Sequence, residues 1–481
     1  MPRRREQSIE HLLRRAGFGA SQEEVDEFAE LGFRRAVNYL LDYDDVEDNV
    51  DDFIGRPGFV GVTARGALAP ADNITDARQR WLFRMVHSRR PLQEKMALFW
   101  HNHFATAFSK INGAIGGVEA TRLLAAKKTE NPGGIPGQLE LFREHALGNF
   151  RDLLIAVAKD PAVLIWLDGQ TNVRRSPQEN FARELMELFT MGVGTFEETD
   201  VYAGARVFTG WNLARFSGTY YNFNYVGNQH ETSAKDFSFA IFPDGNRRIP
   251  ARSEAQGMQD GVDLINAVAR HPATGPRLAR KLYQFFVSEI SEPDEALIQE
   301  MAREYYRSNF EMKPVMAKLL NSAQFVSRSN RYSRYSWPVE FVARSVKEVG
   351  WAGFSVNDAL TPLINMGQQL FEPPDVNGWE LGPGWFSSGA MLARMNFAAQ
   401  LATNQKFNLR DGARGVGRTP ESLVAHVMDR LSPPDLAADC YSALVDYTRA
   451  GGAWTGSDAQ LATKASGLVH LIVGSGDYQL V

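Results

Sequence analysis

The chain has 481 residues, of which 44% are hydrophobic and 23% are charged, and its formal net charge is −5. This composition is typical of a globular protein and excludes an intrinsically disordered chain. The mildly acidic balance argues against a nucleic-acid partner, because such partners are held by basic residues that neutralise phosphates. The single cysteine, Cys440, excludes an internal disulfide framework and a cysteine-based zinc site.

The first residues, Met1 to Arg5, are basic like the start of a targeting signal, but no apolar segment follows them. The chain continues directly into Ile9–Arg15, which is predicted to be an amphipathic helix. No apolar run is long enough to span a bilayer. We therefore expect a protein without a membrane span that is cytoplasmic, has lost its signal, or is exported together with a partner.

Apolar residues at helical spacing predict helices over most of the chain. The main predicted helices cover residues 8–50, 74–88, 92–104, 138–158, 199–207, 257–269, 274–290, 293–307, 312–322, 336–349, 356–370 and 389–475. Residues 216–250 differ, because Tyr and Phe crowd at 220–225 and alternate at 237–241 before a Pro-Asp-Gly-Asn turn, which predicts a β-hairpin.

The predicted fold class is therefore mostly α. We expect one large helical domain, residues 1–481, with a small β-hairpin insertion near 216–250. That insertion would separate an N-terminal helical half, residues 1–215, from a C-terminal helical half, residues 251–481.

The chain is organised around residues 168–212, whose centre is predicted to be a helix. Ser176 is placed to be its N-cap, Pro177 its first residue, and Glu179 the third residue that completes a capping box. Gly192 marks its end.

Helical periodicity sorts this central helix into two faces. The apolar face carries Phe181, Leu185, Leu188 and Phe189, and the polar face carries Asn180, Arg183, Glu184 and Glu187. A polar stripe of this kind indicates either a solvated face with side-chain pairs or a carboxylate-lined site.

Several separated stretches resemble the bacterial family called "domain of unknown function 1800". They are His11-Leu-Leu-Arg-Arg-Ala-Gly-Phe-Gly19, Met96-Ala-Leu-Phe-Trp-His-Asn-His-Phe104, Asn180-Phe-Ala-Arg-Glu-Leu-Met-Glu-Leu188, Phe208-Thr-Gly-Trp211, His271-Pro-Ala-Thr274, Lys281-Leu282 and Pro373-Pro-Asp-Val-Asn-Gly-Trp379. The resemblance implies a mostly helical fold. Its members often carry an export signal, are often encoded beside a secreted sulfatase-like protein, and often have a histidine where this chain has Phe189.

His101 and His103 are candidate metal ligands. Histidines at i and i+2 point to opposite sides of a helix, so both face one cavity only if the helix ends at Trp100. Glu184 and Glu187 would then complete a site for a divalent metal such as zinc, manganese or iron. The alternative is that one imidazole is a core residue and the other caps the helix.

Glu184 and Glu187 are candidate catalytic carboxylates, with Asp168 as a third. Their i, i+3 spacing brings Glu184 and Glu187 close, so one must be protonated or a cation must lie between them. Arg183, with Arg174 or Arg175, is a candidate for that cation, and an acid–base pair is the catalytic alternative. Asp168 from another segment would suit a glycosidase geometry better than Glu187.

A calcium loop is a further alternative, because Asp168, Gln170, Asn172 and Glu179 occupy positions 1, 3, 5 and 12 of such a loop. Val173 stands where that loop requires a glycine, which argues against it.

Two Gly-Trp dipeptides, at Trp211 and Trp379, supply candidate aromatic side chains for stacking on a ligand. An exposed indole stacks on a sugar ring, whereas a buried one belongs to the core. His230, Lys235, His271 and Lys281 are isolated, and no dinucleotide, P-loop or serine-hydrolase motif occurs.

We expect a hydrolase-like enzyme that acts on a surface or extracellular glycan. Glu184 would be its acid or base, with Glu187 and Asp168 as partner carboxylates. The histidine pair would hold a divalent metal or orient a water, Asn180 and Arg183 would position substrate, and the two tryptophans would stack on it.

Two alternatives remain. The chain would be a non-enzymatic partner that binds a sulfatase-like neighbour and assists its folding or export, or it would be a redox protein with a carboxylate–histidine metal site.

Overall fold

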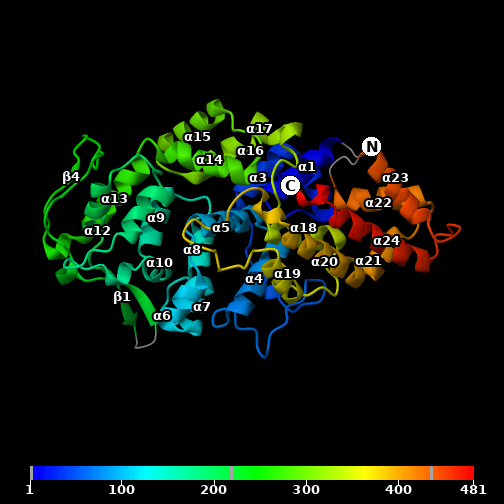
Figure 1. Cartoon of the computed structure of the whole chain (residues 1–481), viewed down its shortest axis with the longest axis horizontal. Helices are drawn as coiled ribbons and strands as arrows, with labels where there is room; N and C mark the ends of the chain where they lie inside the picture. Colours follow the sequence, from blue (N-terminus) through cyan, green and yellow to red (C-terminus); the bar gives the residue numbers. More distant parts are fainter. Residues whose placement is uncertain (1–3, 217–219, 434–436) are drawn as a thin grey trace.

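The structure is a computed structural model that describes residues 4–216, 220–433 and 437–481. Within these ranges the chain forms 24 α-helices, one π-helix, short 3-10 turns and two two-stranded sheets (Figure 1). The predicted mostly α fold is confirmed. In the same ranges, no helix combines the length and apolar character needed to cross a bilayer.

The first ten helices bring the chain to the region of the candidate site. They are α1 (Arg4–Arg15), α2 (Gln22–Leu31), α3 (Phe33–Leu41), α4 (Ile74–His87), α5 (Pro91–His103), α6 (Phe108–Ile115), α7 (Gly117–Ala125), α8 (Gln138–Glu144), α9 (Phe150–Ala158) and α10 (Pro161–Trp166).

The middle of the chain carries the candidate site. Its helices are α11 (Asn180–Glu184), the π-helix (Leu185–Phe189), α12 (Glu198–Val207), α13 (Met258–Arg270), α14 (Thr274–Phe286), α15 (Glu295–Arg307), α16 (Met312–Leu320) and α17 (Ala323–Val326).

The last seven helices, yellow to red in Figure 1, extend from the centre to one end of the molecule. They are α18 (Pro338–Val349), α19 (Asn357–Asn365), α20 (Ser388–Asn404), α21 (Lys406–Ala413), α22 (Pro420–Leu431), α23 (Ala438–Arg449) and α24 (Asp458–Val473).

The β insertion consists of two separate ribbons and begins earlier than predicted. Strand β1 (Trp211–Phe216) pairs antiparallel with β2 (Tyr220–Tyr225), so that Trp211 faces Tyr225. Strand β3 (Lys235–Asp236) pairs with β4 (Arg248–Ile249). Residues 217–219 of the predicted hairpin lie outside the described residues.

Buried apolar side chains from Ile9 to Tyr478 form one cluster that includes residues of both predicted halves. The division of the chain into domains stays a prediction. Helix α5 lies inside this cluster, in the middle of the molecule (Figure 1), and its residues 92–101 are all buried. Pro91 starts α5 at its first position, where a missing N–H costs no helical hydrogen bond.

Asn102 joins the end of α5 to the loop that carries Trp379. Its Oδ1 accepts from the Trp379 backbone N–H at 2.6 Å, and its Nδ2 donates to the Trp379 carbonyl at 3.3 Å. This approach requires Gly378, which has a φ of 80° and whose missing Cβ would lie 2.5 Å from the Asn102 carbonyl oxygen. One amide side chain thus fixes the Asn-Gly-Trp loop against the core.

We expect Gly378→Ala to destabilise the protein by about 3 kcal/mol or more, because a Cβ both strains the backbone and displaces Asn102. Gly415→Ala is the matched control, since Gly415 has the same φ of 80° but open space around its Cβ position. The Gly415→Ala variant should lose only the free energy that backbone strain costs, about 1 kcal/mol. Urea unfolding measures both values, and equal losses would contradict the Asn102 contact.

Candidate functional site

The central helix starts later than the sequence indicates. Helix α11 begins at Asn180, whereas Ser176 forms a β-bridge with Val173. The Gln178 N–H donates to Asn172 Oδ1 at 3.0 Å. The predicted N-cap at Ser176 and its capping box are therefore wrong, because a tight turn before the helix uses these backbone groups instead.

Helix α11 continues directly into the π-helix, Leu185–Phe189. Thr190 ends it, and its hydroxyl donates to the Leu185 carbonyl at 2.5 Å. The Gly192 N–H donates to the Met186 carbonyl at 3.0 Å. Single π turns of this kind are rare and frequently occur at functional sites.

Glu184 and Glu187 flank the start of the π-helix, and both are half-buried. Burial, followed by the charge of Glu187, raises the pKa of Glu184 to about 7 despite the nearby Arg183. Arg183 itself is occupied by ion pairs with Glu198 at 2.5 Å and Glu179 at 3.2 Å. The polar stripe is thus partly shielded from water, and its carboxylates are not neutralised by Arg183 alone.

His103 closes the other end of the π-helix. Its Nε2 lies 3.0 Å from the Phe189 carbonyl oxygen, and its Nδ1 lies 3.2 Å from Lys281 Nζ. A carbonyl oxygen only accepts, so Nε2 carries the hydrogen and Nδ1 accepts from Lys281. Burial, together with the charge of Lys281, keeps the pKa of His103 well below its ordinary value. The ring is therefore neutral and has one defined tautomer.

Helix α14 supplies two cations, Arg277 and Lys281, which share one face at i, i+4. Arg277 Nη2 donates to the Leu188 carbonyl at 3.3 Å, and its charge interacts with that of Glu187. Burial and then the charge of Arg277 lower the pKa of Lys281 to about 7. We call Glu184, Glu187, His103, Arg277 and Lys281 the Glu184 cluster.

His101 does not join this cluster. Helix α5 runs through His103 instead of ending at Trp100, so the two imidazoles leave the helix on different sides. His101 is packed among aromatic rings such as Trp81 and Trp379, and burial lowers its pKa to about 3. The expectation that both rings face one cavity is wrong.

No three His, Cys, Asp or Glu side chains in the described ranges are grouped so that they could hold a metal ion. The predicted divalent-metal site at His101 and His103 therefore has no support in the geometry.

Asp168 lies in a surface turn, with a φ of 60°. Its Oδ2 accepts from Asn180 Nδ2 at 3.0 Å, and its Oδ1 pairs with Lys110 at 3.1 Å. Among the described hydrogen bonds and ion pairs, none joins Asp168 to Glu184. The structure thus brings together Asp168 and Asn180, but leaves the partnership between Asp168 and Glu184 as a prediction.

The calcium-loop pattern does not assemble into a set of free ligands. Asn172 is buried and donates from Nδ2 to the Ala205 carbonyl at 3.0 Å, while its Oδ1 accepts from Gln178. Glu179 pairs with Arg183. Two of the four predicted ligands are therefore used by the fold itself.

Trp211 and Trp379 are core residues, with exposed fractions of 1% and 4%. The Trp211 ring packs edge-on against Phe208 and Phe223, with centroids 5.3 Å apart in each pair. Neither indole exposes a ring face on which a sugar could stack, so the predicted stacking role has no support in this structure.

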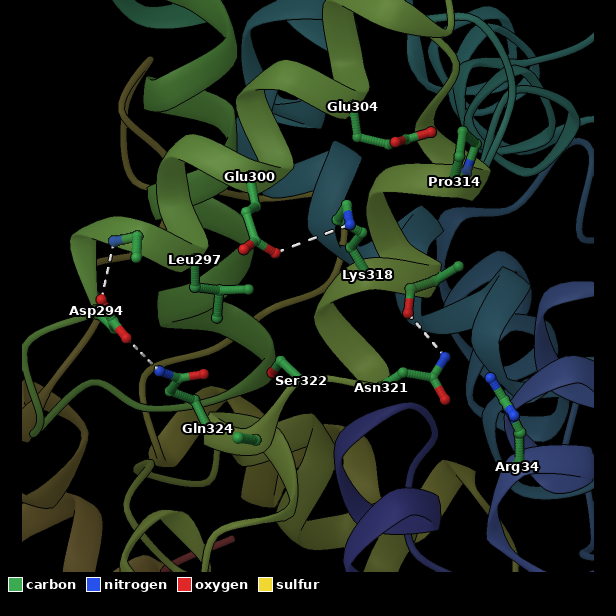
Figure 2. Close-up of a pocket in the computed structure, with 13 residues that line it drawn as sticks. Arg34, Asp294, Leu297, Glu300, Glu304, Pro314, Lys318, Asn321, Ser322 and Gln324 are labelled. Atoms are coloured by element: carbon green, nitrogen blue, oxygen red, sulfur yellow. Dashed lines mark hydrogen bonds and ion pairs between the residues drawn. The ribbon is translucent and has the colours of Figure 1, made fainter.

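A groove of about 690 Å³ lies between α15 and α16 (Figure 2), and none of its lining residues belongs to the Glu184 cluster. Most of its polar side chains already have partners within the protein. Lys318 lies 3.8 Å from Glu300, and Gln324 donates to Asp294 at 2.9 Å. The size of this groove does not make it a site, because few of its polar groups are available to a ligand.

A family model described as "Protein of unknown function (DUF1800)" matches residues 11–480. The chain belongs to this family. No curated protein and no solved structure matches it. The resemblance predicted from the sequence is confirmed, and it assigns no activity.

The sequence did not indicate Arg277 and Lys281 as site residues. Two signals were present, their i, i+4 spacing on one helix and the occurrence of Lys281 in a stretch that resembles the family. Neither signal says that α14 lies against the π-helix, which is a tertiary contact.

We expect the Lys281 amine to become reactive as the pH rises through about 7, because its pKa is lowered and it is neutral above that pH. Acetylation with a limiting reagent, followed site by site by mass spectrometry, measures this. Exposed Lys128 is the reference. If Lys281 gains reactivity only in parallel with Lys128, the lowered pKa is contradicted.

Proposed function

We propose that the Glu184 cluster is the acid–base centre of a hydrolase-like enzyme. The observation that carries this proposal is the pair of half-buried carboxylates at the junction of α11 and the π-helix, of which Glu184 has a pKa raised to about 7. A carboxyl group with such a pKa is protonated often enough at neutral pH to donate a proton, and ionises readily afterwards.

The two carboxylates take different roles because their surroundings differ. Glu184 donates its proton to the leaving oxygen as the bond to that oxygen breaks. Glu187, whose charge faces Arg277, accepts a proton from the attacking water. This division is the one that glycoside hydrolysis requires, in which one carboxyl group is an acid and the other a base or nucleophile.

The remaining members of the cluster position these carboxylates. Arg277 donates to the π-helix at Leu188 and faces Glu187. Lys281 donates to His103, which in turn donates to the carbonyl of Phe189. Both chains of contacts end on the backbone that carries the carboxylates, so α14 and α5 set the orientation of the π-helix.

A surface or extracellular glycan remains the proposed substrate class. The support is the carboxylate pair, since the two buried indoles contribute none. The alternative role, a partner that assists a sulfatase-like protein, stays a prediction, and co-purification of the two chains tests it.

We expect Glu184→Gln to lower the turnover of a cleaved glycoside by about 100-fold or more, because the amide cannot donate the proton. Activity of the unchanged protein should fall as the pH rises above about 7, since Glu184 then loses its proton. A panel of 4-methylumbelliferyl glycosides provides the assay. Glu421→Gln, at an exposed position of α22, is the control and should leave turnover unchanged.

Carbon-13 NMR titration of labelled glutamate, assigned with Glu184→Gln, gives a substrate-independent check. A Glu184 carboxyl that titrates at the ordinary value of an exposed glutamate would contradict the acid role, as would full turnover in Glu184→Gln.

A further inference from the structure

A second groove, of about 440 Å³, lies between α19 and α20. The two helices are neighbours near the centre of the molecule (Figure 1). We call it the amide groove, because its polar lining consists of Asn357, Asp358, Thr361, Asn365, Asn396 and Gln400. Its volume falls within the range of small-molecule sites, roughly 300–1,000 Å³.

The polar side chains of the amide groove are unpaired. In the described chain, none of the six makes a side-chain hydrogen bond or an ion pair with another part of the protein. The groove between α15 and α16 is the opposite case, because its Glu300, Lys318, Asp294 and Gln324 bond to one another (Figure 2). The smaller groove therefore offers more free donors and acceptors than the larger one.

The chemistry of this lining selects a neutral polyhydroxylated ligand. Each amide side chain both donates and accepts, as each sugar hydroxyl does. The lining contains no cation, which argues against phosphate and sulfate groups, and a single carboxylate, Asp358. Apolar side chains contribute little to this lining, because Ala393 is half-buried and Phe397 is buried, with an exposed fraction of 1%.

We propose that the amide groove binds an oligosaccharide of uncharged sugars. None of its lining residues belongs to the Glu184 cluster, so the groove would hold a glycan without cleaving it. Binding here is measurable in the Glu184→Gln variant, which separates a failure of this proposal from a failure of the hydrolase proposal.

Isothermal titration of the full chain with maltoheptaose, cellopentaose and chitopentaose tests the proposal. Saturable binding of at least one of them is expected. The double variant Asn365→Ala/Asn396→Ala should weaken it by about 10-fold or more, since two side chains that bond the ligand are lost. Both residues are exposed, so the variant should melt at the temperature of the unchanged protein.

Asn321→Ala, an exposed asparagine of the groove in Figure 2, is the matched control and should bind as the unchanged protein does. The proposal is overturned if all three sugars fail to bind, or if the double variant binds them unchanged. It is equally overturned if an uncharged Gly-Ser peptide binds in the groove and the sugars do not.

Discussion

The hydrogen bonds of one neutral imidazole hold the candidate site together. His103 stands at the end of a buried helix, donates from Nε2 to the Phe189 carbonyl, and accepts from Lys281 at Nδ1. It therefore joins α5, the π-helix and α14 through a single ring. A protonated ring has no acceptor to offer Lys281, so the neutral form is part of the architecture.

The burial that keeps His103 neutral also shapes the neighbouring groups. Lys281 lies near Arg277, and both burial and that like charge favour the loss of its proton. The carbonyls of Leu188 and Phe189, at the end of the π-helix, accept from Arg277 and His103 and carry partial negative charge, which favours cations beside them. The pKa of Glu184 shifts in the opposite direction to that of Lys281, because burial and the charge of Glu187 favour the protonated carboxyl group. The site thus holds an acid and an amine that both titrate near neutrality.

Periodicity was sufficient to predict the helical fold, because apolar spacing reports the buried face of each helix. It also placed Glu184 and Glu187 on one stripe, and both are half-buried. The predicted N-cap at Ser176 was wrong, because a turn stabilised by Asn172 forms there in place of a capping box. The π-helix and the approach of Lys281 depend on tertiary packing, which no local spacing encodes. The prediction that His101 and His103 face one cavity was wrong because α5 continues through His103.

Nitrogen-15 NMR of the His103 ring, with the resonances assigned by a His103→Gln variant, measures both the protonation state and the tautomer of this imidazole. We expect a neutral ring with hydrogen on Nε2 and a bare Nδ1 throughout the range from about pH 6 to pH 8. If the ring gains a second proton in this range, or carries its hydrogen on Nδ1, then His103 does not join the three helices in the way described.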